Sequence, residues 1–228
     1  MGIKAVIWDL DGTLIHFKID FIRARRKVIS ILRKFGAPRK ILSIKNKFTD
    51  TIEMAKNFFY EKGYDKEEIN KIIQEANRAI INVEREAALQ ATLINGIKQV
   101  LDFIKANGLK QAIFTYNTRE NAELSLKKAN IIEYFEIIVG RDSISNPKPH
   151  PEHLLYICKK LNVKPHEIVV IGDSGRDIEA GIKVGAYTLG LKTLVPEAFR
   201  DHYFYKANKI IEIGEIPSKL IKAIQDLK

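Results

Sequence analysis

The sequence has little cysteine, little proline and no long apolar run. Cys158 is the single cysteine among 228 residues, so no disulfide can form within the chain. This cysteine usage is typical of a reducing compartment, and we expect a cytoplasmic protein. No stretch approaches the roughly 20 apolar residues that a membrane helix needs, and the amino terminus lacks the pattern of a signal peptide. We therefore expect no membrane partner.

Acidic residues are scarce in one segment. From Lys18 to Lys47, eleven Lys or Arg residues stand against one acid, Asp20, and this segment accounts for the whole net charge of +10. It could be a solvated helix surface, a means of attracting an anionic substrate, or a nucleic-acid contact. Aromatic residues are not regularly interleaved with the basic ones. We therefore do not expect nucleic acid as the partner.

Residues 16–88 have a helical pattern. Apolar residues at helical spacing predict one helix from Asp20 to about Phe35, a shorter one through Ile41 and Phe48, and two more that begin at Asp50 and Asp65. We expect an inserted all-helical cap domain of about four helices over residues 16–88. Residues 1–15 and 89–228 would then form the core domain.

Strands alternate with helices in that core. An apolar run at residues 3–8 predicts the first strand, and further strands are predicted at 111–114, 136–139, 168–171, 186–191 and 210–211. Helices are predicted at 97–106, 118–129, 151–161, 178–184 and 217–227. This alternation predicts an α/β fold, a Rossmann-like parallel sheet with helices on both faces.

Polar side chains follow three of the predicted strands. The first strand ends in Asp9-Leu10-Asp11-Gly12-Thr13, and Thr115 and Asp173 follow two others. A carboxylate at the end of a buried strand is costly unless a metal or a reaction compensates. A turn in which an aspartate bonds its own backbone is the alternative. Because sites in parallel sheets form at the carboxyl ends of the strands, we expect these groups to share one site.

The order of the polar motifs resembles that of a known family. Asp9-Leu10-Asp11-Gly12-Thr13, Thr115, Lys148-Pro149-His150-Pro151 and Gly172-Asp173-Ser174-Gly175-Arg176-Asp177 look like the four motifs of the haloacid dehalogenase superfamily of hydrolases. The match covers residues 1–15 and about 92–228. The helical insertion resembles, by position and helicity, the cap of the phosphoglycolate-phosphatase-like branch. His16-Phe17 and Tyr116 depart from the pattern of close relatives, so the resemblance does not assign the substrate.

The residues themselves suggest phosphoryl transfer. Asp9 is ionised at pH 7 and could attack phosphorus, forming an aspartyl-phosphate. Asp11 points the same way along a strand and could act as acid and base if its pKa is raised. Asp173 and Asp177 offer the hard oxygen ligands that Mg²⁺ favours, and Lys148 offers a positive charge to phosphoryl oxygens.

The resemblance implies the same roles. It makes Asp9 the nucleophile, Asp11 the acid and base, Asp173 a metal ligand, and Thr115 and Lys148 phosphate-binding residues. Mg²⁺ would take a side-chain oxygen of Asp9 and the backbone carbonyl of Asp11. In the family, the residue at the position of Asp177 usually orders the lysine or supports the metal from outside its ligands. We also predict Asn117 as a phosphate-binding residue.

These observations predict a magnesium-dependent phosphomonoester hydrolase that acts on a small phosphorylated metabolite, as a monomer or homodimer. The second acid, Asp11, favours phosphate chemistry, because a dehalogenase has no leaving oxygen to protonate. A phosphosugar mutase of the same superfamily is one alternative. A non-catalytic, basic nucleic-acid-binding or regulatory protein on the same core is the other, and the clustered carboxylates count against it.

Overall fold

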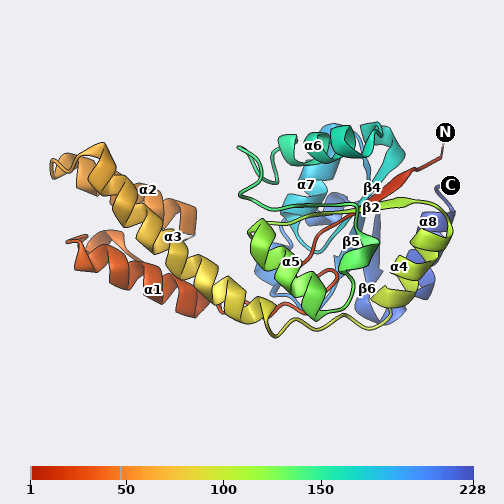
Figure 1. Cartoon of the computed structure of the whole chain (residues 1–228), viewed down its shortest axis with the longest axis horizontal. Coiled ribbons are helices and arrows are strands. Elements are labelled where there is room, and N and C mark those ends of the chain that lie inside the picture. The colour runs from red at the N-terminus through yellow and green to blue at the C-terminus, as the bar shows by residue number, and fades with distance from the viewer. Residues whose placement is uncertain (1, 47) are drawn as a thin grey trace. The chain divides into compact units, whose positions relative to one another are not determined.

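A computed structural model describes residues 2–46 and 48–228, and the chain divides into two compact units (Figure 1). Residues 1–18 and 88–228 form the core unit, and residues 19–87 form the helical unit. The first boundary therefore falls at residue 18 rather than at residue 15. The reason is that the His16 N–H donates to the Thr92 carbonyl at 2.9 Å, and Lys18 Nζ donates to the Gln90 carbonyl at 2.8 Å.

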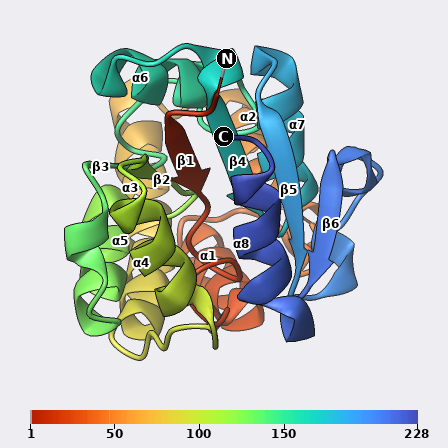
Figure 2. The same cartoon turned by 90° about the vertical axis from the view of Figure 1, so that its right-hand side faces the viewer.

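The core unit is built on a six-stranded parallel sheet (Figure 2). Its strands are β1 (Ala5–Trp8), β2 (Lys110–Phe114), β3 (Ile137–Val139), β4 (Ile168–Gly172), β5 (Tyr187–Lys192) and β6 (Lys209–Glu212), in the spatial order β3-β2-β1-β4-β5-β6. All neighbouring pairs run parallel, and Trp8 is in register with Ile113 on one side and Ile171 on the other. The predicted α/β fold is confirmed.

Helices cover both faces of this sheet. On one face pack α4 (Ile97–Ala106), α5 (Arg119–Lys128) and α8 (Ser218–Gln225), and on the other α6 (Glu152–Leu161) and α7 (Gly175–Val184). Successive side chains of a strand point to opposite faces. Val6 and Trp8 therefore join the first apolar cluster, whereas Ala5 and Ile7 join the second. This alternation explains why β1 is apolar throughout.

One boundary in the core unit differs from its prediction in a way that matters for the site. Helix α7 begins at Gly175 rather than Ile178, because Ser174 caps it. The Asp177 carboxylate, three residues on, accepts from the Ser174 N–H at 2.9 Å, as the acidic residue of a capping box does, and from the Ser174 hydroxyl at 2.6 Å. Asp177 therefore lies in the first turn of a helix, directly behind the end of β4.

The helical unit contains α1 (Phe21–Lys34), α2 (Phe48–Glu61) and α3 (Lys66–Ala88). Asp20 caps α1 by accepting from the Arg23 N–H at 2.9 Å, as predicted. At the start of α3, the Asp65 N–H donates to the Glu68 carboxylate at 2.9 Å and the Glu68 N–H donates to the Asp65 carboxylate at 2.8 Å, also as predicted. The apolar faces of the three helices form one cluster centred on the fully buried Phe59.

Two predictions for this unit were wrong. The expected helix through Ile41 and Phe48 is only a 3₁₀ turn at Arg39–Ile41, so the described part of residues 16–88 holds three α-helices rather than four. The Ser43 hydroxyl accepts from the Lys45 N–H at 3.2 Å, which favours a turn over helix continuation. The helix expected to start at Asp50 starts at Phe48, which places Asp50 in its first turn.

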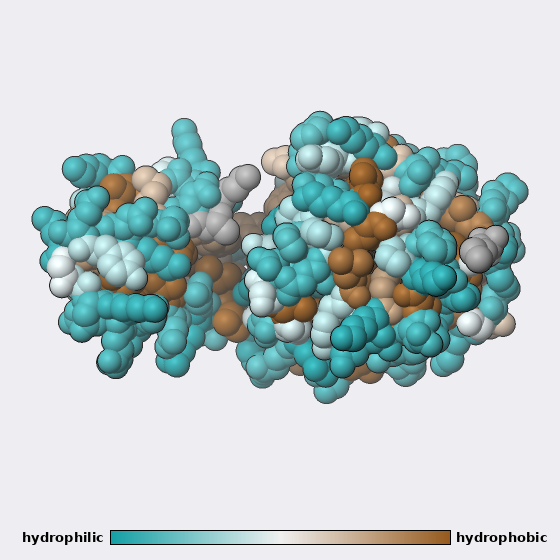
Figure 3. Space-filling view, turned by 90° about the horizontal axis from the view of Figure 1, so that it is seen from above, coloured by the Kyte–Doolittle hydropathy of each residue, from teal (hydrophilic) through white to brown (hydrophobic). Residues whose placement is uncertain are grey.

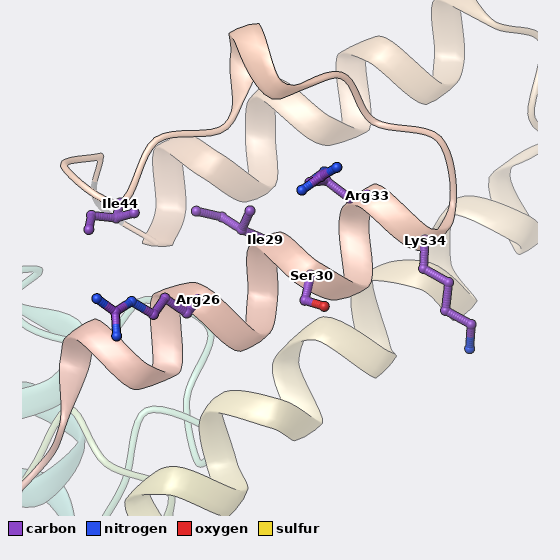
Figure 4. A pocket seen from close by; sticks show the side chains of 6 residues that line it. All are labelled: Arg26, Ile29, Ser30, Arg33, Lys34 and Ile44. Atoms are coloured by element: carbon purple, nitrogen blue, oxygen red, sulfur yellow. The ribbon is translucent and has the colours of Figure 1, made fainter.

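Polar side chains cover most of the face shown in Figure 3, with shorter apolar patches between them. No helix in residues 2–46 or 48–228 is long and apolar enough to span a bilayer. Part of the basic segment lines a hollow of about 410 Å³ along α1 (Figure 4). Its lining residues are Arg26, Ile29, Ser30, Arg33, Lys34 and Ile44.

Candidate active site

Asp9 stands at the carboxyl end of β1, in the middle of the sheet. Its backbone N–H donates to the Ile171 carbonyl of β4 at 2.8 Å, which extends the pairing by one residue and fixes the backbone there. The side chain is only 5% exposed. Its Oδ1 lies 2.5 Å from Lys148 Nζ. An ionised carboxylate is thus held, nearly dry, at the sheet edge where a site was predicted.

Lys148 reaches this carboxylate from the loop before α6. Its Nζ lies 2.5 Å from Asp9 Oδ1, 2.7 Å from Asp177 Oδ1 and 2.9 Å from the Phe114 carbonyl. The contacts with Asp9 and with the Phe114 carbonyl are hydrogen bonds, and the contact with Asp177 is an ion pair. The ammonium also lies 4.3 Å from the centre of the Phe114 ring. Lys148 is therefore a fixed, buried positive charge between two carboxylates.

Asp173 follows β4 and packs against the loop that follows Asp9. Thr13 Oγ1 donates to Asp173 Oδ1 at 3.3 Å. Gly12 has a φ of +92°, and a Cβ at this position would lie 2.6 Å from Asp173 Oδ2 and 2.5 Å from Val195 Cγ1. Gly12 is thus required both for the turn and for the close approach of Asp173. Thr193 Oγ1 donates to the Gly12 carbonyl at 2.5 Å and holds the turn in place.

Asp177 is fully buried, and both of its carboxylate oxygens are engaged. Oδ2 accepts from the Ser174 N–H at 2.9 Å and from the Ser174 hydroxyl at 2.6 Å. Oδ1 forms the ion pair with Lys148. A Cβ on Gly172 would collide with the Asp177 side chain, so glycine is needed there. This arrangement orients Asp177 toward the lysine.

The carboxylates form a cluster that fits a divalent cation. Asp9, Asp173 and Asp177 each offer an oxygen, and these oxygens lie within 4.8 Å of one another. Three negative charges against the one positive charge of Lys148 leave an excess of two in a buried place. Hard oxygen donors with this excess match the preference of Mg²⁺. The residues present therefore fit the predicted magnesium ion.

Burial and the closeness of these charged groups shift the pKa values of Asp9, Asp173 and Lys148. Burial raises the pKa of Asp9, with Asp177 adding to the rise and Lys148 opposing it. Burial raises the pKa of Asp173 well above its usual range, and the charges of Asp9 and Asp177 push it further up. Burial alone would lower the pKa of Lys148, but the Asp177 and Asp9 carboxylates outweigh it and raise the value. Lys148 therefore remains a positively charged ammonium group beside the Asp9 and Asp177 carboxylates.

Asp11 and the segment after β2 complete the edge. Asn117 Nδ2 donates to Asp11 Oδ2 at 3.3 Å, and Asn117 Oδ1 accepts from the Thr118 N–H at 2.9 Å. Thr115 Oγ1 accepts from the Asn117 N–H at 3.0 Å. Thr115 is buried and Asp11 is half-buried. All seven predicted site residues thus gather at one edge, with the Asn117 amide directed to Asp11.

The structure adds side chains that the sequence analysis did not single out. Thr13 and Ser174 lie inside the recognised motifs, and the Ser174-x-x-Asp177 capping pattern was a usable signal. Thr193 and His153 carry no such signal, because their partners lie far away in the sequence or in another element. His153 is fully buried, and its Nδ1 accepts from the Lys148 N–H at 3.2 Å.

Sites in parallel α/β sheets form at the carboxyl edge, and the charged cluster lies there. Residues 6–191 match the model of the haloacid dehalogenase-like hydrolase family, and the chain belongs to that family, as predicted. It is 26% identical to a phosphoglycolate phosphatase of Nitrosospira multiformis over 226 residues, 97% of each chain. It is 25% identical to a phosphorylated carbohydrates phosphatase of Thermotoga maritima over 193 residues, 80% of this chain and 82% of that one.

A solved structure shares the fold over nearly the whole length. The β-phosphoglucomutase of Clostridium difficile superposes with a TM-score of 0.68, at 23% identity, over 98% of this chain and 97% of its own. At this identity the likeness shows the fold alone.

Proposed function

We propose that the chain is a magnesium-dependent phosphatase that hydrolyses a phosphomonoester of a small metabolite through an aspartyl-phosphate on Asp9. The observation that carries the proposal is the contact of Asp9 with Lys148 at 2.5 Å, inside a cluster with two further carboxylates. A buried nucleophile beside a fixed cation is what attack on an anionic phosphoryl group requires. The relatives named as phosphatases support the same reaction class.

Asp9 and Asp173, with the backbone carbonyl of Asp11, would hold the magnesium ion. When bound, Mg²⁺ neutralises the repulsion between the anionic nucleophile and the anionic phosphoryl group. Asp177 serves a different purpose in this proposal. Both of its oxygens are engaged by Ser174 and Lys148, so it keeps the lysine in place.

In the first half of the reaction, an Asp9 carboxylate oxygen attacks phosphorus and the bond from phosphorus to the ester oxygen breaks. Asp11 starts protonated and gives its proton to that oxygen, so the product leaves as an alcohol. Asn117 orients Asp11 through its 3.3 Å hydrogen bond. Lys148 and Thr115 bind the phosphoryl oxygens during this transfer.

In the second half, Asp11 is ionised and takes a proton from water. The water oxygen attacks phosphorus, the bond from phosphorus to Asp9 breaks, and inorganic phosphate leaves. Asp9 returns as a carboxylate and Asp11 is again protonated, which closes the cycle. One buried carboxylate and one half-buried carboxylate, two residues apart, thus divide the roles of nucleophile and acid–base group.

Phosphate release from an aryl phosphate, with and without Mg²⁺, tests the proposal. Asp9→Asn should lower kcat by about 10³-fold or more, because the amide is not a nucleophile. Asp226→Asn, an exposed change next to the end of α8, is the matched control and should keep wild-type turnover. Turnover that persists in Asp9→Asn would contradict the proposal. A folded wild type that neither binds Mg²⁺ nor releases phosphate would overturn the enzyme assignment itself.

A further inference from the structure

Tyr116 and Arg176 meet at the carboxyl edge of the sheet, on segments that flank β1. Tyr116 lies two residues beyond the end of β2, and Arg176 is the second residue of α7, which follows β4. Strand β1, which carries Asp9, lies between β2 and β4. The Arg176 guanidinium carbon lies 4.6 Å from the centre of the Tyr116 ring, well within the range of a cation–π contact. Two segments on either side of the nucleophile are thus joined.

The Arg176 guanidinium is held but not neutralised. Within residues 2–46 and 48–228, the cation–π contact with Tyr116 is the one polar or aromatic interaction of this side chain, and no hydrogen bond or ion pair engages its N–H groups. Both acids of α7 are paired with lysines, Asp177 with Lys148 and Glu179 with Lys183, each at 2.7 Å. The half-buried guanidinium therefore rests against the ring and keeps its N–H donors unused.

The Tyr116 side of the contact is also fixed. Arg141 Nη1 donates to the Tyr116 carbonyl at 2.6 Å, which holds the backbone, while the Tyr116 side chain stays 37% exposed. The ring is therefore a partly open platform on a tethered segment. The Arg176 side chain that rests on it is half-buried.

Both residues are chain neighbours of groups that touch the reacting centre. Asn117, which follows Tyr116, donates to Asp11 at 3.3 Å. Asp177, which follows Arg176, pairs with Lys148 at 2.7 Å. Each member of the pair is therefore one position along the chain from a group that would handle the phosphoryl oxygens or the leaving group.

We propose that Arg176, positioned on the Tyr116 ring, binds a second anionic group of the substrate. This rests on the proposed phosphatase function and narrows its substrate class to phosphomonoesters that also carry a carboxylate or a second phosphoryl group. A guanidinium fork matches both of these groups, because each presents two oxygens in one plane. A phosphorylated neutral sugar would leave the fork without a partner.

The proposal is tested with three alkyl phosphates of the same chain length that differ in their other end group. This group is a carboxylate, a second phosphate or a neutral carboxamide. Wild type should hydrolyse at least one anionic ester with a kcat/KM about 10-fold or more above that of the carboxamide, and the two anionic esters identify which group is taken. Arg176→Gln should lower kcat/KM for that ester by roughly 10- to 100-fold, the worth of a charge-assisted hydrogen bond. The loss for the carboxamide should be at least about tenfold smaller.

Two variants of Tyr116 distinguish the contribution of its aromatic ring from that of its hydroxyl group. Tyr116→Leu removes the ring and should reduce the preference for the anionic ester, whereas Tyr116→Phe keeps the ring and should retain most of it. Lys128→Gln removes one positive charge at the carboxyl end of α5, at the opposite edge of the sheet, and should leave the preference unchanged. This control excludes an effect of overall charge.

Calorimetric binding of the three corresponding phosphonates gives the same comparison without turnover. If wild type hydrolyses none of the esters, the proposed function fails, and the phosphonate affinities of wild type and Arg176→Gln still decide the role of Arg176. If Arg176→Gln lowers the affinity for all three phosphonates by the same factor, so that their affinity ratios stay as in wild type, the inference is overturned. A selective loss for an anionic ligand supports it.

Discussion

His153 Nδ1 accepts a hydrogen bond from the Lys148 backbone N–H at 3.2 Å, and this contact anchors the loop that carries the lysine. The other ring nitrogen, Nε2, bonds the Val139 carbonyl at the end of β3 at 2.9 Å. The ring meets Phe114 edge-on, with centroids 5.6 Å apart. A single neutral imidazole, protonated on Nε2, thus joins the lysine loop to the ends of β2 and β3.

The two hydrogen bonds of the His153 ring predict different outcomes for two substitutions of His153 by side chains of similar size. His153→Leu leaves the Lys148 N–H buried without a partner, while the Val139 carbonyl keeps the Thr115 N–H at 3.0 Å. The variant should be less stable by about 1–3 kcal/mol and should have a higher KM. His153→Asn places an amide oxygen near the position of Nδ1. Its KM should therefore stay closer to the wild-type value than that of His153→Leu, and its loss of stability should be smaller. Urea unfolding and Michaelis–Menten kinetics measure both. Equal KM values in the two variants would contradict a positioning role.

The buried imidazole also predicts how stability depends on pH. Burial lowers the pKa of His153 from 6.5 to about 4. Between these values the unfolded chain binds a proton that the folded chain does not, so this contribution is complete above pH 6.5 and is lost as the pH falls toward 4. When complete, this contribution of His153 to the free energy of unfolding is about 3 kcal/mol. Wild type should therefore lose more stability than His153→Asn over this interval, and parallel curves would exclude the shift.

Gly12 and Gly36 form a matched pair for testing the turn after Asp9. Both have a positive φ, +92° and +95°, but a Cβ on Gly12 would strike Asp173 and Val195, whereas nothing lies within 4 Å of one on Gly36. Alanine should cost about 1–2 kcal/mol at either position from backbone strain alone. Only Gly12→Ala should also displace Asp173, lowering kcat by roughly 10-fold or more. An unchanged kcat in Gly12→Ala, measured beside Gly36→Ala, would show that Asp173 tolerates the shift.

The sequence was most informative where chemistry coincides with the end of an element. Asp9, Asp173 and Thr115 follow apolar strands, and parallel strands place such residues at one edge whatever the details of packing. The family motifs located Lys148 because its neighbours are distinctive. The contact of Tyr116 with Arg176 spans sixty positions and depends on how two loops pack, which no periodicity encodes.

The helical unit shows the other limit of sequence reading. Spacing of apolar residues located α1 and α3 correctly, since long amphipathic helices repeat their pattern over many turns. Ile41 and Phe48 matched the same template over too short a span, and a local hydroxyl bond at Ser43 favoured a turn instead. Apolar character alone also does not place a residue inside, since Ile22 at the start of α1 is 53% exposed whereas Ala24 is buried.

Asp173→Asn should have opposite effects on stability and on magnesium binding. Because burial and the neighbouring carboxylates raise its pKa in the folded protein, the ionised Asp173 costs stability near pH 7. The neutral amide removes this cost and can still accept from Thr13 Oγ1. In the presence of a chelator, Asp173→Asn should therefore melt a few degrees above wild type.

Added Mg²⁺ should raise the melting temperature of wild type and have little effect on Asp173→Asn, since a ligand that binds only the folded state stabilises it. A variant that melts below wild type in chelator, or that gains as much from Mg²⁺, would remove Asp173 from the metal site.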